Sequence, residues 1–277
     1  MPNFEDVTST GPRTAPEHSI DTAVPHSARV WNYWLGGKDN YPADREVGDH
    51  IRAANPMIAD IAVAQRAFLV RTVRHLATHE GIDQFLDVGT GLPTADNTHE
   101  VAQRVDPTAR VVYTDHDPLV LTHARALLTG SPEGATDYID ADLHDPERII
   151  REAAGTLDLN RPIALMLLGI TAHVVDDDEA YALVRRLRDP LPSGSFLVLC
   201  DDTNVIAPTE MDEMIRQWNE SGENPRINRT PERIAGFFEG LEMLEPGLVS
   251  VTQWRPEPTE VGSPRPLDDF GAVARKR

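Results

Sequence analysis

A glycine turn is the first part of this sequence that could bind a small molecule. Gly89, Thr90 and Gly91 directly follow the apolar run at 85–88, and a helix is expected to begin at about Thr94. Glycines in such a turn let the backbone adopt positive φ and approach a ligand with no Cβ in the way, while the first N–H groups of the helix point at the site. The pattern is typical of a nucleotide-binding turn, although Gly-x-Gly alone also suits an ordinary strand-to-helix connection.

Aspartates stand where several strands of the same sheet are expected to end. Asp87 lies inside the first strand–turn unit, Asp115 ends an apolar run at 110–114, and Asp142 follows a third candidate strand. Ligands of an open parallel sheet bind at the carboxyl ends of the strands, so these carboxylates are expected at one site. Asp115 also stands roughly 20 residues beyond the turn, which favours a role in accepting ribose hydroxyls. Asp117 is interpreted as a helix cap.

An alternating series of strands and helices is needed to position these residues. The predicted strands are 85–88, 110–114, 138–139, 163–168 and 195–200, and the predicted helices are 118–128, 176–188, 208–219 and 231–238. This alternation predicts the α/β class, with a doubly wound, mostly parallel, Rossmann-like sheet. Short strands are expected near 241–244 and 248–252. The proline-rich segment from Pro256 is expected to wrap the surface, with its last residues as a tail.

The N-terminal part of the chain has a different character. Residues 1–24 are rich in Pro, Thr, Ser, Glu and Asp with little apolar periodicity, so a flexible tail is predicted. Residues 25–80 are expected to form a helical cap or lid that is broken at Gly36-Gly37. Residues 81–277 then form the ligand-binding α/β domain.

Polar groups crowd among aromatic side chains on either side of the Gly36-Gly37 break. The residues concerned are Asn32, Tyr33, Asp39, Asn40 and Tyr41. A helix that only covered the core would not need so many hydrogen-bonding groups, so we expect a lid that closes over a bound ligand and lines the pocket of the second substrate. The alternative is a permanently docked cap whose polar groups satisfy one another.

Composition argues against several classes of partner. The 277 residues carry 26 Lys and Arg against 45 Asp and Glu, a formal net charge of −19, which would repel a nucleic-acid backbone and an anionic membrane surface alike. The single cysteine, Cys200, ends an apolar run and is expected to be a buried strand thiol. No apolar run approaches the roughly 20 residues of a membrane span, and no signal-peptide pattern is visible. A cytoplasmic protein is therefore expected.

Several longer strings resemble those of a known enzyme family. They are NYWLGGKDNYPADR, DVGTGLPT, YTDHDP and FFEGLEMLEPGLVSVTQWRP, and the resemblance covers nearly all of residues 29–277. The chain resembles the class I S-adenosylmethionine-dependent methyltransferases, and most closely a bacterial subfamily of S-adenosyl methyltransferases of unknown substrate. One departure from many methyltransferases is Pro93, near which a further glycine or alanine is common. The bacterial subfamily also has a pattern that resembles G-T-G-x-P at this position, so Pro93 agrees with it.

The resemblance implies S-adenosylmethionine as the cofactor and S-adenosylhomocysteine as its product. Gly89, Thr90 and Gly91 would lie against the amino-acid part of the cofactor. Asp87 would lie near the cofactor's ammonium group or a bound water, and Asp115 would hold the ribose hydroxyls.

The adenine end of the cofactor would have its own set of residues by the same resemblance. His116 would flank the adenine ring. Asp142 would accept a hydrogen bond from the adenine amino group, with Leu143 packing nearby. Gly169 would lie beneath the cofactor.

Two other functions remain open at this point. A nicotinamide-dependent oxidoreductase also uses a glycine turn and a ribose carboxylate, but its pyrophosphate favours G-x-G-x-x-G, whereas the last position here is Thr94. No persuasive Tyr-x-x-x-Lys pair is present either. The other alternative is a noncatalytic protein that binds S-adenosylmethionine.

Catalytic residues are less well marked than cofactor residues. Methyl transfer to a heteroatom needs mainly in-line proximity, so a base is not required. His173, after the fourth strand, is the best-placed candidate base, although a lone histidine also suits a structural role. No metal site is expected, because Asp201-Asp202 and 176–178 are interpreted as a strand-end turn and a helix start. The aromatic cap suggests a small organic acceptor, and the sequence carries no signal for its identity or for the oligomeric state.

Overall fold

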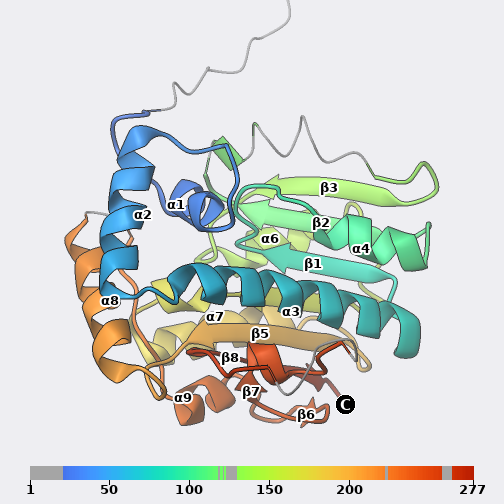
Figure 1. The fold of residues 1–277 in the computed structure, drawn as a ribbon. Helices are drawn as coiled ribbons and strands as arrows, with labels where there is room; N and C mark the ends of the chain where they lie inside the picture. Colours follow the sequence, from blue (N-terminus) through green and yellow to red (C-terminus); the bar gives the residue numbers. More distant parts are fainter. Residues whose placement is uncertain (1–20, 118, 121, 123–129, 222–223, 258–263) are drawn as a thin grey trace, which may run out of the picture.

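Eight strands form one mostly parallel sheet within residues 21–117, 119–120, 122, 130–221, 224–257 and 264–277, which the computed structural model describes (Figure 1). The strands are β1 (Gln84–Val88), β2 (Arg110–Asp115), β3 (Ala135–Asp140), β4 (Ala164–Leu168), β5 (Phe196–Asp202), β6 (Glu242–Met243), β7 (Val249–Ser250) and β8 (Asp269–Arg275). Their order is β3-β2-β1-β4-β5-β8-β6, and β7 also pairs with β8. Strands β1 to β5 pair in parallel, whereas β8 runs antiparallel to β5, β6 and β7. The predicted doubly wound, Rossmann-like sheet is confirmed.

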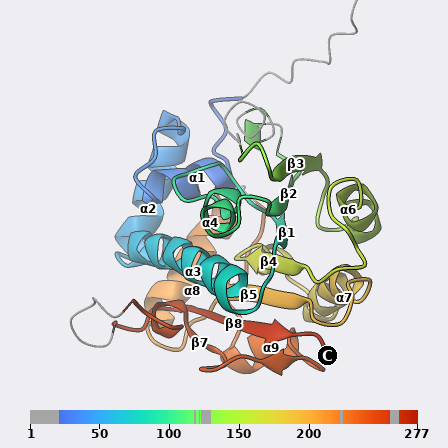
Figure 2. The ribbon, with the colours of Figure 1, turned by 90° about the vertical axis from the view of Figure 1, so that its right-hand side faces the viewer.

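Helices cover both faces of this sheet (Figure 2). They are α1 (Ser27–Trp34), α2 (Pro42–Ala54), α3 (Ile58–His79), α4 (Thr98–Val105), α6 (Pro146–Ala153), α7 (Asp177–Arg188), α8 (Pro208–Glu220) and α9 (Pro231–Gly236), with 3-10 turns η1 (Thr171–His173) and η2 (Val251–Gln253). Helices α3 and α4 lie on one face, and α6 and α7 on the other. Strand side chains alternate between the two layers, so that Phe85 packs on the α3 side and Leu86 on the α7 side.

Helices α1 and α2 form an N-terminal cap beside the carboxyl ends of β1, β2 and β3 (Figure 1). Arg29 of α1 and Asp44 of α2 are both buried and form an ion pair, with Nε 3.0 Å from Oδ1. Trp34 packs against Trp218 of α8, and their ring centroids lie 6.1 Å apart. Helix α1 ends just before Gly36, whose φ is +75°, so the chain turns where the Gly-Gly pair was expected to break the helix.

The C-terminal residues differ from the sequence prediction, because they form a strand of the sheet. The final residues were expected to be a surface segment and a tail, yet 269–275 form β8, which pairs with β5 along its whole length. Val273 in this strand is fully buried. The prediction was wrong because β8 is built largely from small residues and its partner lies far earlier in the sequence. Cys200 of β5 pairs with Gly271 and is buried, as predicted.

Several element boundaries also differ from the prediction. Helix α4 begins at Thr98 rather than at about residue 94, because Asn97 and Glu100 form a capping box there. Strand β5 extends through Asp201 and Asp202, which are strand residues and not a turn. Most of the helix predicted at 118–128 and most of the tail predicted at 1–24 lie outside the described residues; those of the helix that are described, 119, 120 and 122, are helical. Among the residues described, no helix is long and apolar enough to cross a membrane.

Candidate active site

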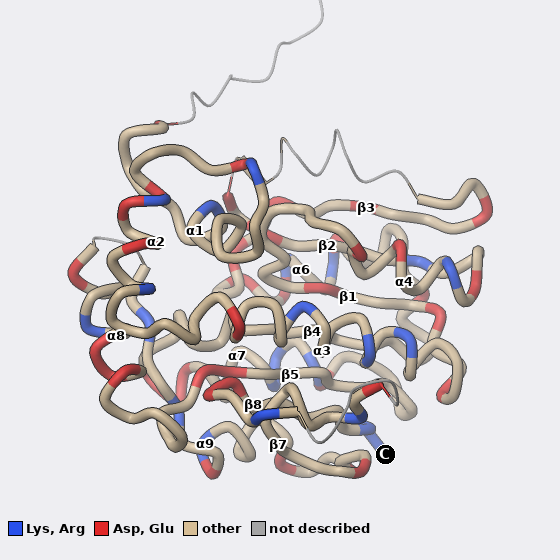
Figure 3. The backbone as a smooth tube through the Cα atoms, in the orientation of Figure 1, with Lys and Arg blue, Asp and Glu red and all other residues tan. Residues whose placement is uncertain are grey.

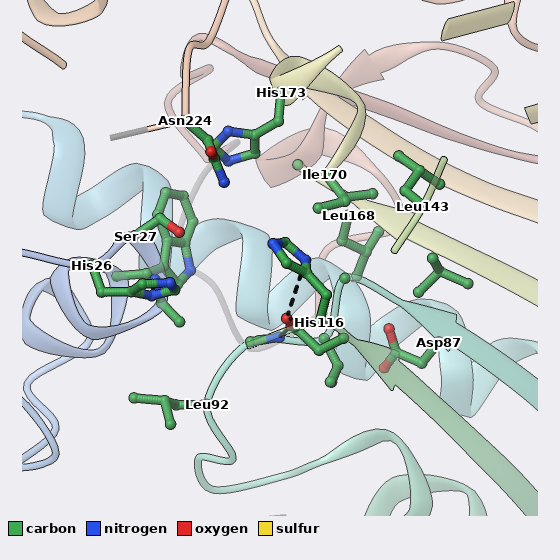
Figure 4. Close-up of a pocket in the computed structure, with 18 of the residues that line it drawn as sticks. His26, Ser27, Asp87, Leu92, His116, Leu143, Leu168, Ile170, His173 and Asn224 are labelled. Atoms are coloured by element: carbon green, nitrogen blue, oxygen red, sulfur yellow. Dashed lines mark hydrogen bonds and ion pairs between the residues drawn. The ribbon is translucent and has the colours of Figure 1, made fainter. Parts of the chain in front are cut away.

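A cavity of about 390 Å³ lies at the carboxyl ends of β1 to β4 (Figure 4). The loops after these strands supply one wall, and α1, α3 and residues 224–226 supply the other. Small-molecule sites in proteins commonly have volumes of roughly 300 to 1,000 Å³. The cavity is lined by every cofactor residue predicted from the sequence: Asp87, Gly89, Thr90, Gly91, Asp115, His116, Asp142, Leu143 and Gly169.

The glycine turn brings the backbone close to its neighbours on the floor of the cavity. Gly89 donates its N–H to the carbonyl of Thr114 in β2 over 2.8 Å, with φ at +74°. A Cβ at Gly89 would lie 2.4 Å from Cγ1 of Ile170, so the position has no room for a side chain. Gly91 also has positive φ, +65°, but faces open space. Positive φ therefore favours glycine at both positions, and Gly89 in addition has no space for a Cβ.

Asp87 is a buried carboxylate at the end of β1. Thr98 donates its hydroxyl to Oδ2 over 2.6 Å, which ties α4 to the strand. Burial raises the pKa of Asp87 to about 6, against the opposing effects of the Thr98 hydrogen bond and the nearby Arg66 charge. Arg66 of α3 also lines the cavity, and it donates from Nη2 to the carbonyl of Ala95.

Asp115 lies at the end of β2 and is held by three backbone N–H groups. Oδ2 accepts from Gly91 at 2.8 Å, and Oδ1 accepts from His116 at 2.9 Å and Asp117 at 3.1 Å. Burial raises the pKa of Asp115, and these backbone hydrogen bonds oppose the rise. In Figure 4 the His116 ring points into the cavity, between His26 at the start of α1 and Asp87 on the opposite side.

Asp142 follows β3 and is half exposed at the rim. Its Oδ1 accepts the backbone N–H of His144 at 2.8 Å and lies 2.7 Å from His144 Nδ1. Partial burial acts to raise the pKa of Asp142, but the hydrogen bonds from His144 outweigh it and lower the pKa. Oδ2 has no partner among the described residues and is available to a ligand.

The cap contributes fewer of the expected residues. Of the five predicted lid residues, Asn32 lines the cavity. Tyr33 instead donates its hydroxyl to Asp49 at 2.7 Å, and the backbone of Tyr41 donates to Asp44 in the capping box of α2. Asp39 and Asn40 both donate to Oδ1 of Asn32.

The part of the cavity wall that the cap supplies comes from α1 and from the residues at its two ends. Its residues are His26, Ser27, Ala28, Trp31, Asn32 and Leu35. From Ser27 and Ala28 the lining positions recur after three or four residues, at Trp31, Asn32 and Leu35, as on one side of a helix, and this signal was present in the sequence.

His173 and Arg226 meet the cavity from the β4 and β5 side. His173 lies in η1, and burial, assisted by the Arg226 charge, lowers its pKa to about 3. Its Nδ1 is buried without a partner in the described part of the chain. Arg226, which the sequence did not single out, donates from Nη2 to Asp202 at 2.6 Å. Its guanidinium lies over the rings of Trp31 and Trp218, 5.7 Å and 5.4 Å from their centroids.

Gly169 follows β4 and has a φ of +73°. A Cβ there would lie 3.0 Å from Nε2 of Gln65, a second cavity residue that the sequence did not single out. Gln65 donates from Nε2 to Asp269 of β8 at 3.1 Å. Strand β8, which was not predicted from the sequence, thus helps to orient Gln65 in the cavity wall.

A mostly parallel sheet with a glycine turn after β1 and carboxylates at the carboxyl ends of β1, β2 and β3 defines the protein as a class I S-adenosylmethionine-dependent methyltransferase. The chain belongs to the S-adenosyl methyltransferase family, whose model matches residues 13–277. Its methyl donor is therefore S-adenosylmethionine. The oxidoreductase and noncatalytic alternatives gain no support.

Solved structures similar to this chain agree with the family. A DUF574 family protein from Streptomyces avermitilis is 46% identical with a TM-score of 0.90, over 94% of this chain and 100% of that one. A candidate methyltransferase from Thermobifida fusca is 39% identical with a TM-score of 0.85, over 95% and 98%. An S-adenosylmethionine-dependent methyltransferase from Anabaena variabilis shares the fold, at 16% identity and a TM-score of 0.52 over 92% and 98%. No functionally curated protein matches the sequence.

Proposed function

We propose that the methyl donor binds along the carboxyl ends of β1, β2 and β3, with the glycine turn against its amino-acid part and Asp115 on its ribose. The position of Asp115 carries this proposal. Its side chain lines the cavity with 12% of its surface exposed, and three backbone N–H bonds fix the direction of its oxygens. An ionised carboxylate has about four lone-pair sites, so acceptor capacity remains for ribose hydroxyls.

The other predicted residues have places that suit this arrangement. Asp87 supplies a buried carboxylate for the donor's ammonium group, directly or through water. Asp142 has one oxygen left to accept from the adenine amino group, with Leu143 beside it and His116 flanking the ring. Gly169 lies under the donor, at a position where a side chain would meet Gln65 of the cavity wall. When bound, S-adenosylmethionine supplies an electrophilic methyl group on a sulfonium.

The acceptor in this proposal is a small organic molecule that enters between the N-terminal cap, α1 and α2, and the donor-binding domain. Trp31, Leu35 and Ile170 give the acceptor side of the cavity an apolar lining. His173 serves there as a neutral hydrogen-bonding group, because a pKa of about 3 leaves its ring uncharged near pH 7. Proximity and orientation then supply the main part of the rate enhancement. The net charge of −19, spread over helices and strands alike in Figure 3, supports a small molecule over nucleic acid.

Calorimetry tests the donor site. The purified protein should bind S-adenosylmethionine and S-adenosylhomocysteine and show no heat with NAD. Binding of NAD without a response to either sulfur ligand would contradict the proposal. Radiolabelled donor with a panel of small acceptors then tests for methyl transfer.

A further inference from the structure

The cavity has two chemically different halves. Three carboxylates are found among the described lining residues, Asp87, Asp115 and Asp142, and they lie at the carboxyl ends of β1, β2 and β3. The half that faces β4 and β5 is lined by His173 and by Arg226 and contains no carboxylate among the described lining residues. A cationic methyl donor suits the first half, so the second half is left for the acceptor.

Arg226 is held as a preformed cation at the border of the acceptor half. It is 6% exposed, and its guanidinium is fixed by the Asp202 ion pair and by the rings of Trp31 and Trp218. Nη2 is used by Asp202, and Nε is fully buried. Nη1 has no partner within the described part of the chain and is not fully enclosed, so it is the donor that remains for a ligand.

Asn32, which follows Trp31 in α1, supplies a second donor to the cavity. Its Oδ1 accepts the backbone N–H of Asp39 at 3.0 Å and the amide of Asn40 at 3.1 Å, which fixes the orientation of the side-chain amide. Nδ2 is therefore the free end, and it has no partner among the residues described. Two N–H donors thus border a wall that is otherwise apolar, formed by Trp31, Leu35 and Ile170.

We infer that this half of the cavity takes an acceptor with an apolar, ring-sized body and a carboxylate group, and that Arg226 Nη1 and Asn32 Nδ2 bind the carboxylate. The inference rests on the proposed function, in which the donor fills the other half. Planar donors of this kind match a carboxylate better than a neutral amide, because charge-assisted hydrogen bonds are about twice as strong as neutral ones. Asp202 holds Arg226 in place, and is a positioning residue.

The test uses small fluorinated probes and the full-length protein loaded with S-adenosylhomocysteine. Binding of 4-fluorobenzoate, 4-fluorobenzamide and 4-fluorobenzylamine is followed by fluorine NMR. The benzoate should bind at least about tenfold more tightly than the amide and the amine, as expected for a charge-assisted contact. Equal binding of the three probes, or no binding of the benzoate, would overturn the inference.

Two variants locate the preference. Asn32→Asp keeps the oxygen that accepts from Asp39 but replaces the free amide by a negative oxygen, so it should abolish the benzoate preference. The pair Asp202→Asn with Arg226→Gln removes the guanidinium without leaving a buried carboxylate unpaired, and should do the same. Arg216→Gln on the exposed face of α8 is the matched control and should change nothing. If either cavity variant stays folded and keeps the preference, the assignment of these donors is wrong.

Calorimetry with S-adenosylhomocysteine alone separates this inference from the proposed function. Wild-type protein that binds S-adenosylhomocysteine but shows no benzoate preference contradicts only the acceptor assignment. Wild-type protein that does not bind S-adenosylhomocysteine contradicts the donor site itself.

Discussion

The carboxylate of Asp115 accepts a hydrogen bond from the backbone N–H of Gly91 at 2.8 Å. One side chain at the end of β2 therefore fixes the turn that follows β1. This contact joins the glycine turn to the aspartate that was predicted to share its site, because both stand at the ends of predicted parallel strands. It also means that the ribose-binding group and the glycine turn hold each other in position before any ligand arrives.

Replacing Asp115 should weaken binding of S-adenosylhomocysteine much more than replacing Asp117. Asp115→Ala removes the proposed ribose partner and should cost about 1 to 3 kcal/mol of binding free energy. Asp117 makes none of the contacts proposed for the donor. Its Oδ1 accepts the backbone N–H of Leu119 at 2.8 Å, and its Oδ2 lies 3.1 Å from Nδ1 of His26. Asp117→Ala should chiefly lower stability, by about 1 kcal/mol. Calorimetry on both variants measures the difference, and equal affinities for wild type and Asp115→Ala would refute the ribose assignment.

Alanine should be tolerated differently at the two glycines of the turn. At Gly91 it should cost about 1 to 2 kcal/mol of folding stability from positive φ alone. At Gly89 the same backbone penalty is joined by the clash with Ile170, so the loss should be larger by a further 1 to 3 kcal/mol or so. Urea denaturation of the two variants gives the comparison. A Gly89→Ala protein as stable as Gly91→Ala would show that Ile170 moves aside freely.

Much of the sheet could be predicted because its central strands are continuous apolar runs between turn residues. The cofactor residues followed, since they stand directly after those runs. The cap was harder. Tyr33 and Asn32 are neighbours in sequence, but only the packing of α1 against α2 decides which of them faces the cavity. Arg226 was missed because its partners, Asp202 and Trp31, come from distant parts of the chain.

Strand β8 should be essential to the fold. Val273→Asp places a charge on a fully buried side chain between β5 and β6, with no cation built to receive it, and should cost several kcal/mol or prevent folding. Arg277→Ala, just beyond the strand and 78% exposed, should change stability by no more than about 0.5 kcal/mol. Circular dichroism and thermal melting test both. Cooperative unfolding of Val273→Asp near the wild-type temperature would mean that β8 is dispensable.

Burial of His173 should make the free energy of unfolding decrease as the pH falls below about 6.5. Its pKa is about 3 when folded and the ordinary 6.5 when unfolded, so the unfolded chain binds the extra proton between these values. The folded state is thus favoured fully above pH 6.5 and loses this contribution as the pH falls toward 3. Between pH 7 and pH 5 the wild type should lose about 1 to 2 kcal/mol more than His173→Gln. Asp87 and Asp201, whose pKa values burial raises to about 6, act in the opposite direction but are present in both proteins. Parallel stability curves for the two proteins would show that His173 is not buried in solution.

The cap should respond to the donor if it acts as a lid. Hydrogen exchange of residues 35–41, between α1 and α2, should slow when S-adenosylhomocysteine binds, because α1 lines the cavity. Residues 130–134, which precede β3 at the amino end of the strands, are the internal control. Unchanged exchange at 35–41 in protein that is saturated with ligand would favour the permanently docked cap.

The burial of Cys200 has a practical consequence. It is the single cysteine of the sequence, and burial raises the pKa of its thiol well above the usual range, so the folded protein should be inert toward thiol reagents. A cysteine introduced at the exposed position of Arg104 would then be the only reactive site, and could carry a fluorophore or spin label without removing the native residue. In the unmodified protein the same thiol becomes a reporter of global unfolding, since a colorimetric thiol reagent gains access only when β5 separates from β8.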